Sequence, residues 1–332
     1  MSDEQLPIAT VVIPMLDEAD HIEACLDAFG KQTYPLDHLD LVVVDGGSTD
    51  GSRALVEARA AREPWVRVVD NAAGRASAAF NRGVEAAKGS IVFLFSAHGV
   101  PENDYVASSV RALQESGVAG VGGRYEHVGL DRRSSAIGLA MVSPFGMASP
   151  HRFAARRQEV DTISHPAYRR EVMLDVGPFD ETLLRNSDYE FNFRMRALGY
   201  RLLFDPSVGS IYRPRPSLRA LGRQFWWYGR WKARVVARHP GSRRARHLVP
   251  PAVVVVLSLS PILVGFRSGR RLLPRLGGLY GALVLAAVVH SRPSQHQADP
   301  VVLAAAFPVM HVSWGAGYLT SVLQDRAKRG AA

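Results

Sequence analysis

Polar side chains that could hold a ligand follow several apolar runs in the first hundred residues. Each run is short and rich in β-branched residues, which is typical of a buried strand. In a parallel α/β sheet, ligands bind beyond the carboxyl ends of the strands. Carboxylates, an arginine, a hydroxyl and an imidazole at that edge could bind a polar, charged small molecule. The residues at these positions are Asp17, Glu18, Asp45, Arg75, Ser96 and His98.

Strands and helices must alternate to bring these side chains to one edge. Strands are predicted at residues 9–14, 41–45, 66–69 and 91–95. Apolar positions at helical spacing predict helices over 17–29, 52–62 and 75–88. Strands that alternate with helices indicate an α/β fold with a mostly parallel, doubly wound sheet and right-handed crossovers.

The usual nucleotide and metal motifs are absent from the sequence. No phosphate-binding Gly-x-x-x-x-Gly-Lys-Ser/Thr loop occurs, and Gly120-Val-Gly122 lacks the third glycine of a dinucleotide fingerprint. There is no zinc-type spacing of Cys and His, and no Gly-x-Ser-x-Gly elbow. A bound nucleotide must therefore be held by another scheme.

Three motifs in the first ninety residues resemble the opening of a family 2 glycosyltransferase of GT-A fold. They are Val12-Ile-Pro14-Met-Leu-Asp17-Glu18, Val42-Val-Val-Asp45-Gly-Gly-Ser-Thr-Asp50-Gly and Gly74-Arg75 with Asn81-Arg-Gly83. Later motifs resemble the ExoA-like enzymes of succinoglycan biosynthesis. These are His165-Pro-Ala-Tyr, Gly177-Pro-Phe-Asp180-Glu181, Asn186-Ser-Asp188-Tyr-Glu190 and Arg223-Gln224 with Tyr228-Gly229-Arg230. The resemblance covers residues 8–250 and fixes neither donor nor acceptor.

The resemblance implies a nucleoside pocket at the strand ends. Asp45 is expected to accept a hydrogen bond from the uracil imide of a UDP-linked donor. Pro14 and Glu18 are expected to line the same pocket, and Arg75 to contact the base or the diphosphate. For Asp45 the structural alternative is a turn-capping role before Gly-Gly-Ser. Asp50 is expected to cap the turn or the following helix.

The resemblance also assigns the catalytic base to Asp188. There it removes the proton from the acceptor hydroxyl, which attacks the anomeric carbon opposite the diphosphate and inverts that centre. The alternative is a surface aspartate that caps a helix over 188–197, since Asn-Ser-Asp is also good N-cap chemistry. Glu190 and Arg194 on that helix are expected to be structural.

The sequence departs from the family at residues 96–98. Family members carry Asp-x-Asp, or Asp-Ala-His in the ExoA-like group, and a Mn²⁺ or Mg²⁺ ion there neutralises the leaving diphosphate. Ser96 offers a neutral oxygen where a carboxylate is expected, so the affinity for such an ion should fall. His98 is expected to be a metal ligand or a phosphate contact, with a polar loop residue as the alternative. Arginines of the 213–234 region could assist the leaving group instead, and metal dependence stays open.

Composition and charge describe two different halves. The chain has 332 residues, 47% hydrophobic and 21% charged, which excludes a disordered tail, a collagen-like fibre and a disulfide-rich miniprotein. One cysteine, Cys25, cannot form an internal disulfide. Residues 1–200 carry a net charge of −8, and residues 201–332 carry +17. The basic half is expected to meet an anionic membrane surface or, as the minor alternative, a nucleic acid.

Three apolar stretches favour the membrane over nucleic acid. They are 250–266, 276–290 and 300–323. The last would span roughly 36 Å as a helix, enough for a bilayer core. The first two are shorter. They must be re-entrant, have flanking side chains that snorkel to the interface, or lie in a thinner part of the bilayer. The alternative of a buried soluble core fits poorly with so few acidic residues.

The arginines near these stretches bear on orientation. Residues 1–5 contain no apolar signal segment, so the N-terminal domain is expected in the cytoplasm. An expected loop over 267–275 and the C-terminal tail are both basic, and the positive-inside rule places both on the cytoplasmic side. A re-entrant hairpin at 250–266 followed by two spans satisfies this. Three full spans would leave one basic segment outside.

Residues 217–238 are predicted to form a basic amphipathic helix. One sector of about 100° holds five arginines, and another holds six apolar residues between Leu218 and Val236. This pattern indicates an in-plane membrane helix, or alternatively a surface helix with its apolar face on the domain. Acceptor or phosphate contacts are expected from Arg223, Gln224 and Arg230. Processive synthases carry Gln-x-x-Arg-Trp, whereas Gln224 is followed by Phe-Trp-Trp, which favours transfer of one sugar per acceptor.

Together these observations predict three parts and one leading function. Residues 1–212 form a cytoplasmic GT-A domain, 213–248 an interface segment and 249–325 a membrane region of two to three segments. The expected enzyme is an inverting, hexosyltransferase-type glycosyltransferase at the cell membrane, working on a polyprenyl-diphosphate-linked saccharide in exopolysaccharide or cell-envelope glycan synthesis. No nucleic acid partner is expected, but other glycan-assembly proteins are. The alternative, motivated by Ser96, is a catalytically weakened membrane scaffold.

Overall fold

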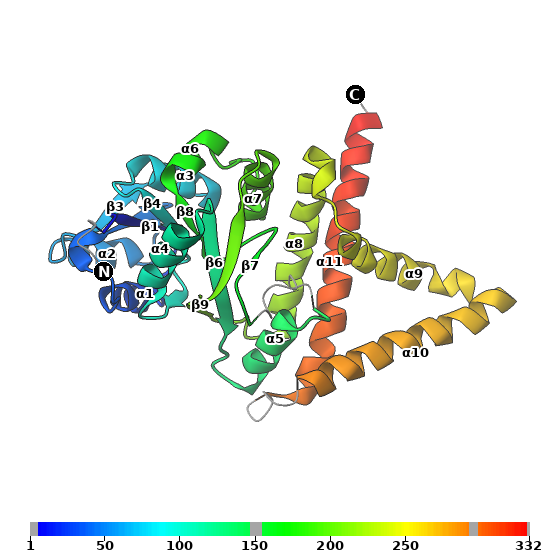
Figure 1. The fold of residues 1–332 in the computed structure, drawn as a ribbon. Helices are drawn as coiled ribbons and strands as arrows, with labels where there is room; N and C mark the ends of the chain where they lie inside the picture. The colour runs from blue at the N-terminus through cyan, green and yellow to red at the C-terminus, as the bar shows by residue number, and fades with distance from the viewer. Residues whose placement is uncertain (1–5, 147–154, 292–297, 331–332) are drawn as a thin grey trace. The chain divides into compact units, whose positions relative to one another are not determined.

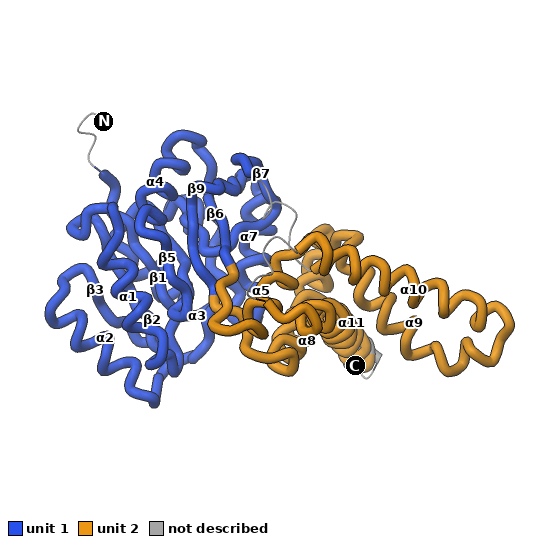
Figure 2. Tube along the Cα trace, turned by 90° about the horizontal axis from the view of Figure 1, so that it is seen from below, with its two compact units in different colours: residues 1–126, 151–212 blue, residues 127–150, 213–332 orange. Residues whose placement is uncertain are grey.

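The structure is a computed structural model that describes residues 6–146, 155–291 and 298–330. Residues 1–5, on which the expectation of an absent signal segment rests, lie outside this part. The chain divides into two compact units (Figure 2). Unit 1 contains residues 1–126 and 151–212, and unit 2 contains residues 127–150 and 213–332.

Unit 1 is built on a mixed sheet whose first four strands are parallel (Figure 1). They are β1 (Ala9–Met15), β2 (Leu39–Asp45), β3 (Val66–Asp70) and β4 (Ile91–Leu94). The register pairs Met15 with Asp45 and Asp45 with Asp70, so three strands end at one level. The predicted parallel strands are confirmed. They could be predicted because strands that are covered on both faces appear in the sequence as continuous apolar runs.

The other strands of the sheet are paired antiparallel. They are β5 (Gly99–Pro101), β6 (Gly120–His127), β7 (Gln158–Glu159), β8 (Ala167–Arg169) and β9 (Leu202–Tyr212). In the described residues the strand order is β3-β2-β1-β4-β8-β6-β9-β5, with β7 on β9. The sheet is thus parallel at its β3 end and antiparallel at the other.

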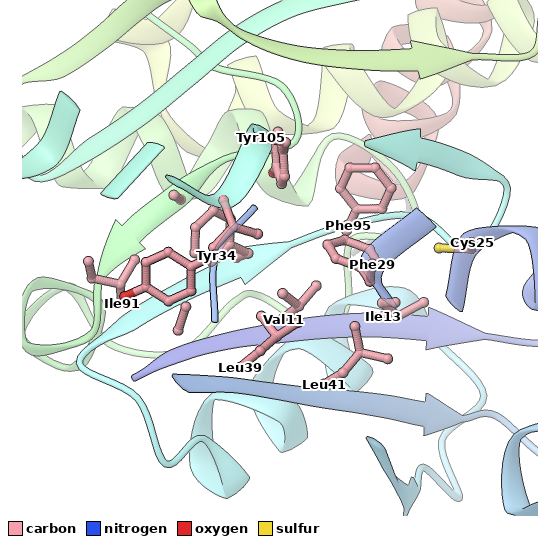
Figure 3. Close-up of a cluster of buried hydrophobic side chains, with 14 of the residues drawn as sticks. Val11, Ile13, Cys25, Phe29, Tyr34, Leu39, Leu41, Ile91, Phe95 and Tyr105 are labelled. Carbon is pink, nitrogen blue, oxygen red and sulfur yellow. The ribbon is translucent and has the colours of Figure 1, made fainter. Parts of the chain in front are cut away.

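Helices cover both faces of the sheet. The larger core lies under α1 (Ile22–Gly30), α2 (Ser52–Ala60) and α4 (Tyr105–Ser116). The second lies under α3 (Ala76–Ala86), α6 (Arg170–Val176) and α7 (Ser187–Ala197). Figure 3 shows Val11, Ile13 and Leu41 of the sheet facing Phe29 in the first core. Each such buried side chain contributes about 1.5–3 kcal/mol of transfer free energy.

The first helix begins later than predicted. The spacing predicts a helix from residue 17, but α1 starts at Ile22. Asp17 has a φ of 53° and cannot start a helix there. The backbone of residues 17–19 is instead held by side chains of the loop after β2. A short 3₁₀ turn, Leu36–His38, precedes β2.

Unit 2 is helical in its described residues. Its helices are α5 (Arg132–Val142), α8 (Leu218–Arg238), α9 (Val249–Leu263), α10 (Arg267–His290) and α11 (Pro300–Gly330), with 3₁₀ turns at Pro240–Ser242 and Ala245–His247. The predicted apolar stripe of α8 is buried, with Leu221 and Phe225 in one core with Phe307 and Met310 of α11. The stripe therefore packs against another helix of unit 2.

The expectation of a hairpin at 250–266 is wrong, because Val249–Leu263 is one continuous helix. The expectation of a loop over 267–275 is also wrong. These residues form the first turns of α10, because arginine and leucine are good helix formers and Gly265 and Phe266 make the turn instead. Three helical segments in the described residues are long and apolar enough to cross a membrane: Ala245–Leu263, Arg267–His290 and Pro300–Asp325. Their number falls within the predicted two to three.

Candidate active site

Two loops at the carboxyl ends of β1 and β2 are tied together by hydrogen bonds. The amide of Thr49 donates to Asp17 Oδ1 at 2.8 Å, and the amide of Asp17 donates to Ser48 Oγ at 3.0 Å. The amide of Ala19 donates to Asp50 Oδ2 at 2.9 Å. Asp50 also accepts from Ser52, as a turn-capping residue does. These contacts fix the strand-end edge at which Pro14 and Glu18 lie.

Asp45 is buried at the end of β2 and has structural partners. Its Oδ1 accepts from the hydroxyl of Ser48 at 2.6 Å and from the Ser48 amide at 3.1 Å. Its Oδ2 lies 3.3 Å from a guanidinium nitrogen of Arg53. The predicted turn-capping contacts are thus present. An ionised carboxylate offers about four acceptor sites, so contact with a base would add to these bonds.

Ser96 and His98 follow β4 and are each held by a second side chain. The His98 Nδ1 lies 3.1 Å from Glu18 Oε1, which joins two predicted site residues from different strands. The hydroxyl of Ser96 lies 3.0 Å from the Nε2 of His165. His165 belongs to a motif of the sequence but had no predicted role; the proline after it, which restricts its backbone, was the available signal.

Arg75 lies at the start of α3. It is the N-cap residue of α3, and its guanidinium donates to the carbonyl oxygen of Glu181 at 3.2 Å. Asn81, one α-helical turn and a half further on, exchanges two hydrogen bonds with the backbone of Phe179. The loop that leads into α7 is therefore fastened to α3, next to Arg75.

Asp188 lies in the first turn of α7 and is exposed. The helix starts at Ser187 with Asn186 at the N-cap, so Asp188 is not the capping residue. In the part of the chain that the structure describes, its carboxylate forms no hydrogen bond or ion pair. The positive end of the helix dipole favours a negative charge at this position.

The rest of α7 anchors the helix. The Tyr168 hydroxyl donates to Asn192 Oδ1 at 2.6 Å, and Asn192 Nδ2 donates to Thr162 at 3.1 Å. The buried carboxylate of Glu190 pairs with Arg194 at 2.8 Å. These are structural contacts of the kind expected for Glu190 and Arg194. They hold the backbone under Asp188 in place.

Three predicted acceptor contacts lie on α8 in unit 2. Arg223 is exposed, and Gln224 donates to the hydroxyl of Tyr228 at 2.9 Å. The guanidinium of Arg230 lies over the rings of Trp226 and Trp227, at 5.1 and 5.6 Å from their centroids. It also donates to Gln324 of α11 at 2.9 Å. Arg223 is thus the more accessible cation of the two.

The donor set at residues 96–98 does not fit a preformed divalent-metal centre. Mg²⁺ and Mn²⁺ prefer carboxylate oxygens, whereas Ser96 supplies a hydroxyl that already bonds His165. Among residues 6–146, 155–291 and 298–330, no group of three or more His, Cys, Asp or Glu side chains could hold a metal ion.

Comparison with known proteins links this geometry to sugar transfer. The model of the glycosyl transferase family 2 matches residues 10–177. The succinoglycan biosynthesis protein ExoA of Rhizobium meliloti (strain 1021) is 31% identical over 333 residues, which is 99% of each chain. The glycosyltransferase AglE of Haloferax volcanii is 28% identical and covers 66% of this chain and 71% of its own.

Two solved structures share the fold. The mannosyltransferase PcManGT from Pyrobaculum calidifontis, in complex with GDP-Man and Mn²⁺, has a TM-score of 0.66 at 21% identity and covers 97% of this chain and 88% of its own. Residues 1–349 of S. aureus TarS, in complex with UDP, give 0.51 at 14% identity, with 95% and 91% covered. The predicted GT-A fold is confirmed.

Proposed function

Because the chain belongs to glycosyl transferase family 2, we propose that it moves a hexose-type sugar from a UDP-linked donor to a polyprenyl-diphosphate-linked saccharide. The product would serve exopolysaccharide or cell-envelope glycan assembly. The observation that carries this proposal is Asp188: an exposed carboxylate without a partner in the described residues, on a helix whose backbone is locked. The similarity to the succinoglycan biosynthesis protein ExoA over nearly the whole chain supports a role in exopolysaccharide synthesis.

The proposed reaction is a single inverting displacement. Asp188 takes the proton of the acceptor hydroxyl, and that oxygen forms a bond to the anomeric carbon. The bond from this carbon to the donor diphosphate breaks, and its electron pair leaves with the diphosphate. Attack from the opposite face inverts the anomeric centre. The exposure of Asp188 supports this role, because an acceptor must reach the base directly.

The donor would lie along the strand-end edge. Asp45 would accept from the uracil imide, with Pro14 and Glu18 beside the nucleoside. Arg75 is a permanent cation beside the loop into α7, so it would contact the diphosphate. His98, with its ring oriented by Glu18, would lie at the same edge. These residues would supply leaving-group stabilisation from the protein itself.

The acceptor would be presented at a membrane. The α9 and α10 helices expose a series of large apolar side chains: Val255, Leu257, Leu259, Ile262, Leu272, Leu279, Leu283 and Leu285. Single exposed leucines are ordinary, but such a series fits a bilayer. We place residues 1–212 on the cytoplasmic side. Arg223, and less directly Gln224 and Arg230, would contact the acceptor diphosphate.

A second function, a membrane scaffold in a glycan-assembly complex, is favoured by one observation. Ser96 replaces the expected carboxylate and is engaged by His165. A scaffold would bind partner proteins and perform no transfer. The exposed Asp188 argues against it, because a carboxylate without a partner in the described residues, on a locked helix, is open to an acceptor.

Substitution of Asp188 by Asn tests the base. The amide is isosteric but cannot take a proton, so transfer should fall by about 10²–10⁴-fold. Binding of UDP, measured as thermal stabilisation of the detergent-solubilised full chain, should stay unchanged. Each ligand is tested with Mn²⁺, with Mg²⁺ and with EDTA, and the donor set predicts stabilisation in EDTA as well.

Glu171→Gln, an exposed change on α6, is the matched control and should leave transfer intact. Transfer retained by D188N would remove Asp188 as the base. A wild-type chain that binds UDP yet transfers nothing would favour the scaffold.

A further inference from the structure

A chain of three hydrogen-bonded side chains runs inward from the strand-end site. The hydroxyl of Ser96 lies 3.0 Å from His165 Nε2, and His165 Nδ1 lies 2.9 Å from the hydroxyl of Ser210. Ser96 follows β4, Ser210 belongs to β9, and His165 precedes β8. Ser210 is buried, whereas Ser96 is partly exposed. The chain therefore has an inner end and an outer end.

The ring of His165 is confined on several sides. It lies 4.1 Å from the centroid of Phe95 and 4.6 Å from that of Tyr125. The Tyr105 hydroxyl donates to its carbonyl oxygen at 2.8 Å, and its backbone has a φ of 42°. Non-glycine residues seldom adopt such a φ unless neighbours enforce it. Several neighbours thus hold the ring of His165 in one position.

Gly99 makes room for this arrangement. A Cβ at that position would lie 3.0 Å from His165 Cε1, 3.0 Å from Ser96 Oγ and 2.8 Å from the Phe95 ring. Real Cβ atoms rarely come that close to other atoms. The contact between the serine and the imidazole therefore depends on a glycine three residues after Ser96.

The inner end sets the direction of the hydrogen bonds. The Ser210 hydroxyl donates to the carbonyl oxygen of Arg124 at 3.5 Å, so its oxygen accepts from His165 Nδ1–H. In a neutral imidazole the other nitrogen is then an acceptor. The Ser96 O–H consequently donates to His165 Nε2. Only lone pairs of the Ser96 oxygen are left to face a ligand, as on a carboxylate.

We propose that His165 is a positioning residue that makes Ser96 an acceptor-only group for a ribose hydroxyl of the nucleotide donor. An acceptor-only oxygen repels phosphate oxygens and attracts hydroxyl groups, which assigns the ribose and not the diphosphate as its partner. This inference rests on the proposed function, since it requires a bound nucleoside diphosphate. It gives Ser96 the hydrogen-bonding character of the aspartate that it replaces.

A double-mutant cycle tests the coupling between the two residues. The dissociation constant of UDP, with GDP in parallel, is measured on the detergent-solubilised full chain and on S96A, H165F and S96A/H165F. Phenylalanine keeps the ring packing and removes both nitrogens. Each single change should weaken UDP binding about 5–10-fold, the value of one net hydrogen bond. The double variant should bind no worse than S96A alone, because His165 acts through Ser96.

Two further variants guard against a folding defect and a purely structural role. Ser210→Ala leaves the ring in place and removes only its inner partner; it should weaken UDP binding with Ser96 present and not in S96A. Ser96→Asp supplies an acceptor that needs no orienting partner, so H165F should have little effect in that background.

The ribose assignment is tested with 2′,3′-dideoxy-UDP. The wild-type chain should bind it several-fold more weakly than UDP, and S96A should not distinguish the two. Effects of S96A and H165F that simply add would overturn the positioning role while leaving nucleotide binding intact. Equal discrimination by S96A and wild type would overturn the ribose contact. A wild-type chain that binds neither UDP nor GDP would overturn the proposed function itself.

Discussion

Some polar side chains of unit 1 form the site and others hold the fold together. Asp40 is one of the structural side chains. Its carboxylate is buried at the start of β2. It accepts from Arg67 Nε at 2.7 Å, from Arg67 NH2 at 2.9 Å, from Thr10 at 2.8 Å and from the Lys88 amide at 3.2 Å. One carboxylate thereby joins β1, β2, β3 and the segment after α3, far from the strand-end edge.

The pKa of Asp40 makes this network sensitive to acid. Burial raises the pKa, but the hydrogen bonds from Arg67 and Thr10 outweigh burial and lower it below its usual value. Its contribution to stability is therefore complete above the unfolded pKa of about 3.9 and is lost as the pH falls through the folded pKa. Asp40→Asn should cost about 2–3 kcal/mol near pH 7 and less in acid.

Denaturant unfolding of wild type and D40N at several pH values checks this expectation. The difference in unfolding free energy should shrink as the pH falls below about 4. Asp37→Asn, an exposed change three residues away, is the control and should show no such trend. A difference between wild type and D40N that stays constant with pH would contradict the account.

The positions of site residues could be predicted, but their partners could not. Apolar runs located Asp45, Ser96 and Glu18 at strand ends, because the strand pattern is local. The bond between Ser96 and His165 joins residues 69 apart in sequence, and no local pattern reports such a pair. The engagement of Arg230 with two tryptophans likewise depends on the helix surface and on α11.

At the scale of elements, unit 2 depends on the close approach of α8 and α11. A Cβ on Gly229 of α8 would lie 1.9 Å from the carbonyl oxygen of Trp314. A Cβ on Gly317 of α11 would lie 2.0 Å from that of Trp226. Small residues at a helix interface let two backbones meet. The same approach buries Leu221 and Phe225.

Gly229→Leu should separate these two helices. Overpacking of this kind costs about 1–3 kcal/mol or more, so the melting temperature in detergent should fall and protease should cut α8 or α11 sooner. The matched control is Gly281→Leu on α10, where a Cβ would meet nothing within 4 Å. Equal melting temperatures for the two variants would show that the close approach is unimportant.

Elements were predicted best where the local pattern is strong, either a continuous apolar run or a helical period. The β1, β2, β3 and β4 strands and α8 lie within two residues of the expected ranges. The start of α1 was missed because side chains of a distant loop hold residues 17–19. The first turns of α10 were missed because clustered arginines were interpreted as a loop, although arginine favours helices.

In the whole molecule, the positive charge and the long apolar helices lie in the same C-terminal part of the chain. Residues 201–332 carry a net charge of +17, and three of their helical segments are long and apolar enough to span a membrane. From the positive-inside rule we expect the start of α10 and the end of α11 on the cytoplasmic side, which requires that α9 does not cross the bilayer.

Cysteine labelling tests this orientation. Cys25 is buried and is first replaced by alanine. In cells that express the chain, an impermeant maleimide should label Ser291→Cys and should leave Ser268→Cys and Asp325→Cys unlabelled until the membrane is permeabilised. Three full spans predict the reverse pattern, so labelling of S268C and D325C in intact cells would contradict the proposed topology.

Release of nucleoside diphosphate from the full chain in lipid nanodiscs is the decisive test of sugar transfer to a lipid-linked acceptor. The chain is supplied with UDP- and GDP-sugars and a polyprenyl-diphosphate-linked saccharide. We predict that UDP is released only when a UDP-sugar and the acceptor are both present. Binding of UDP without acceptor-dependent release from any sugar nucleotide would contradict it.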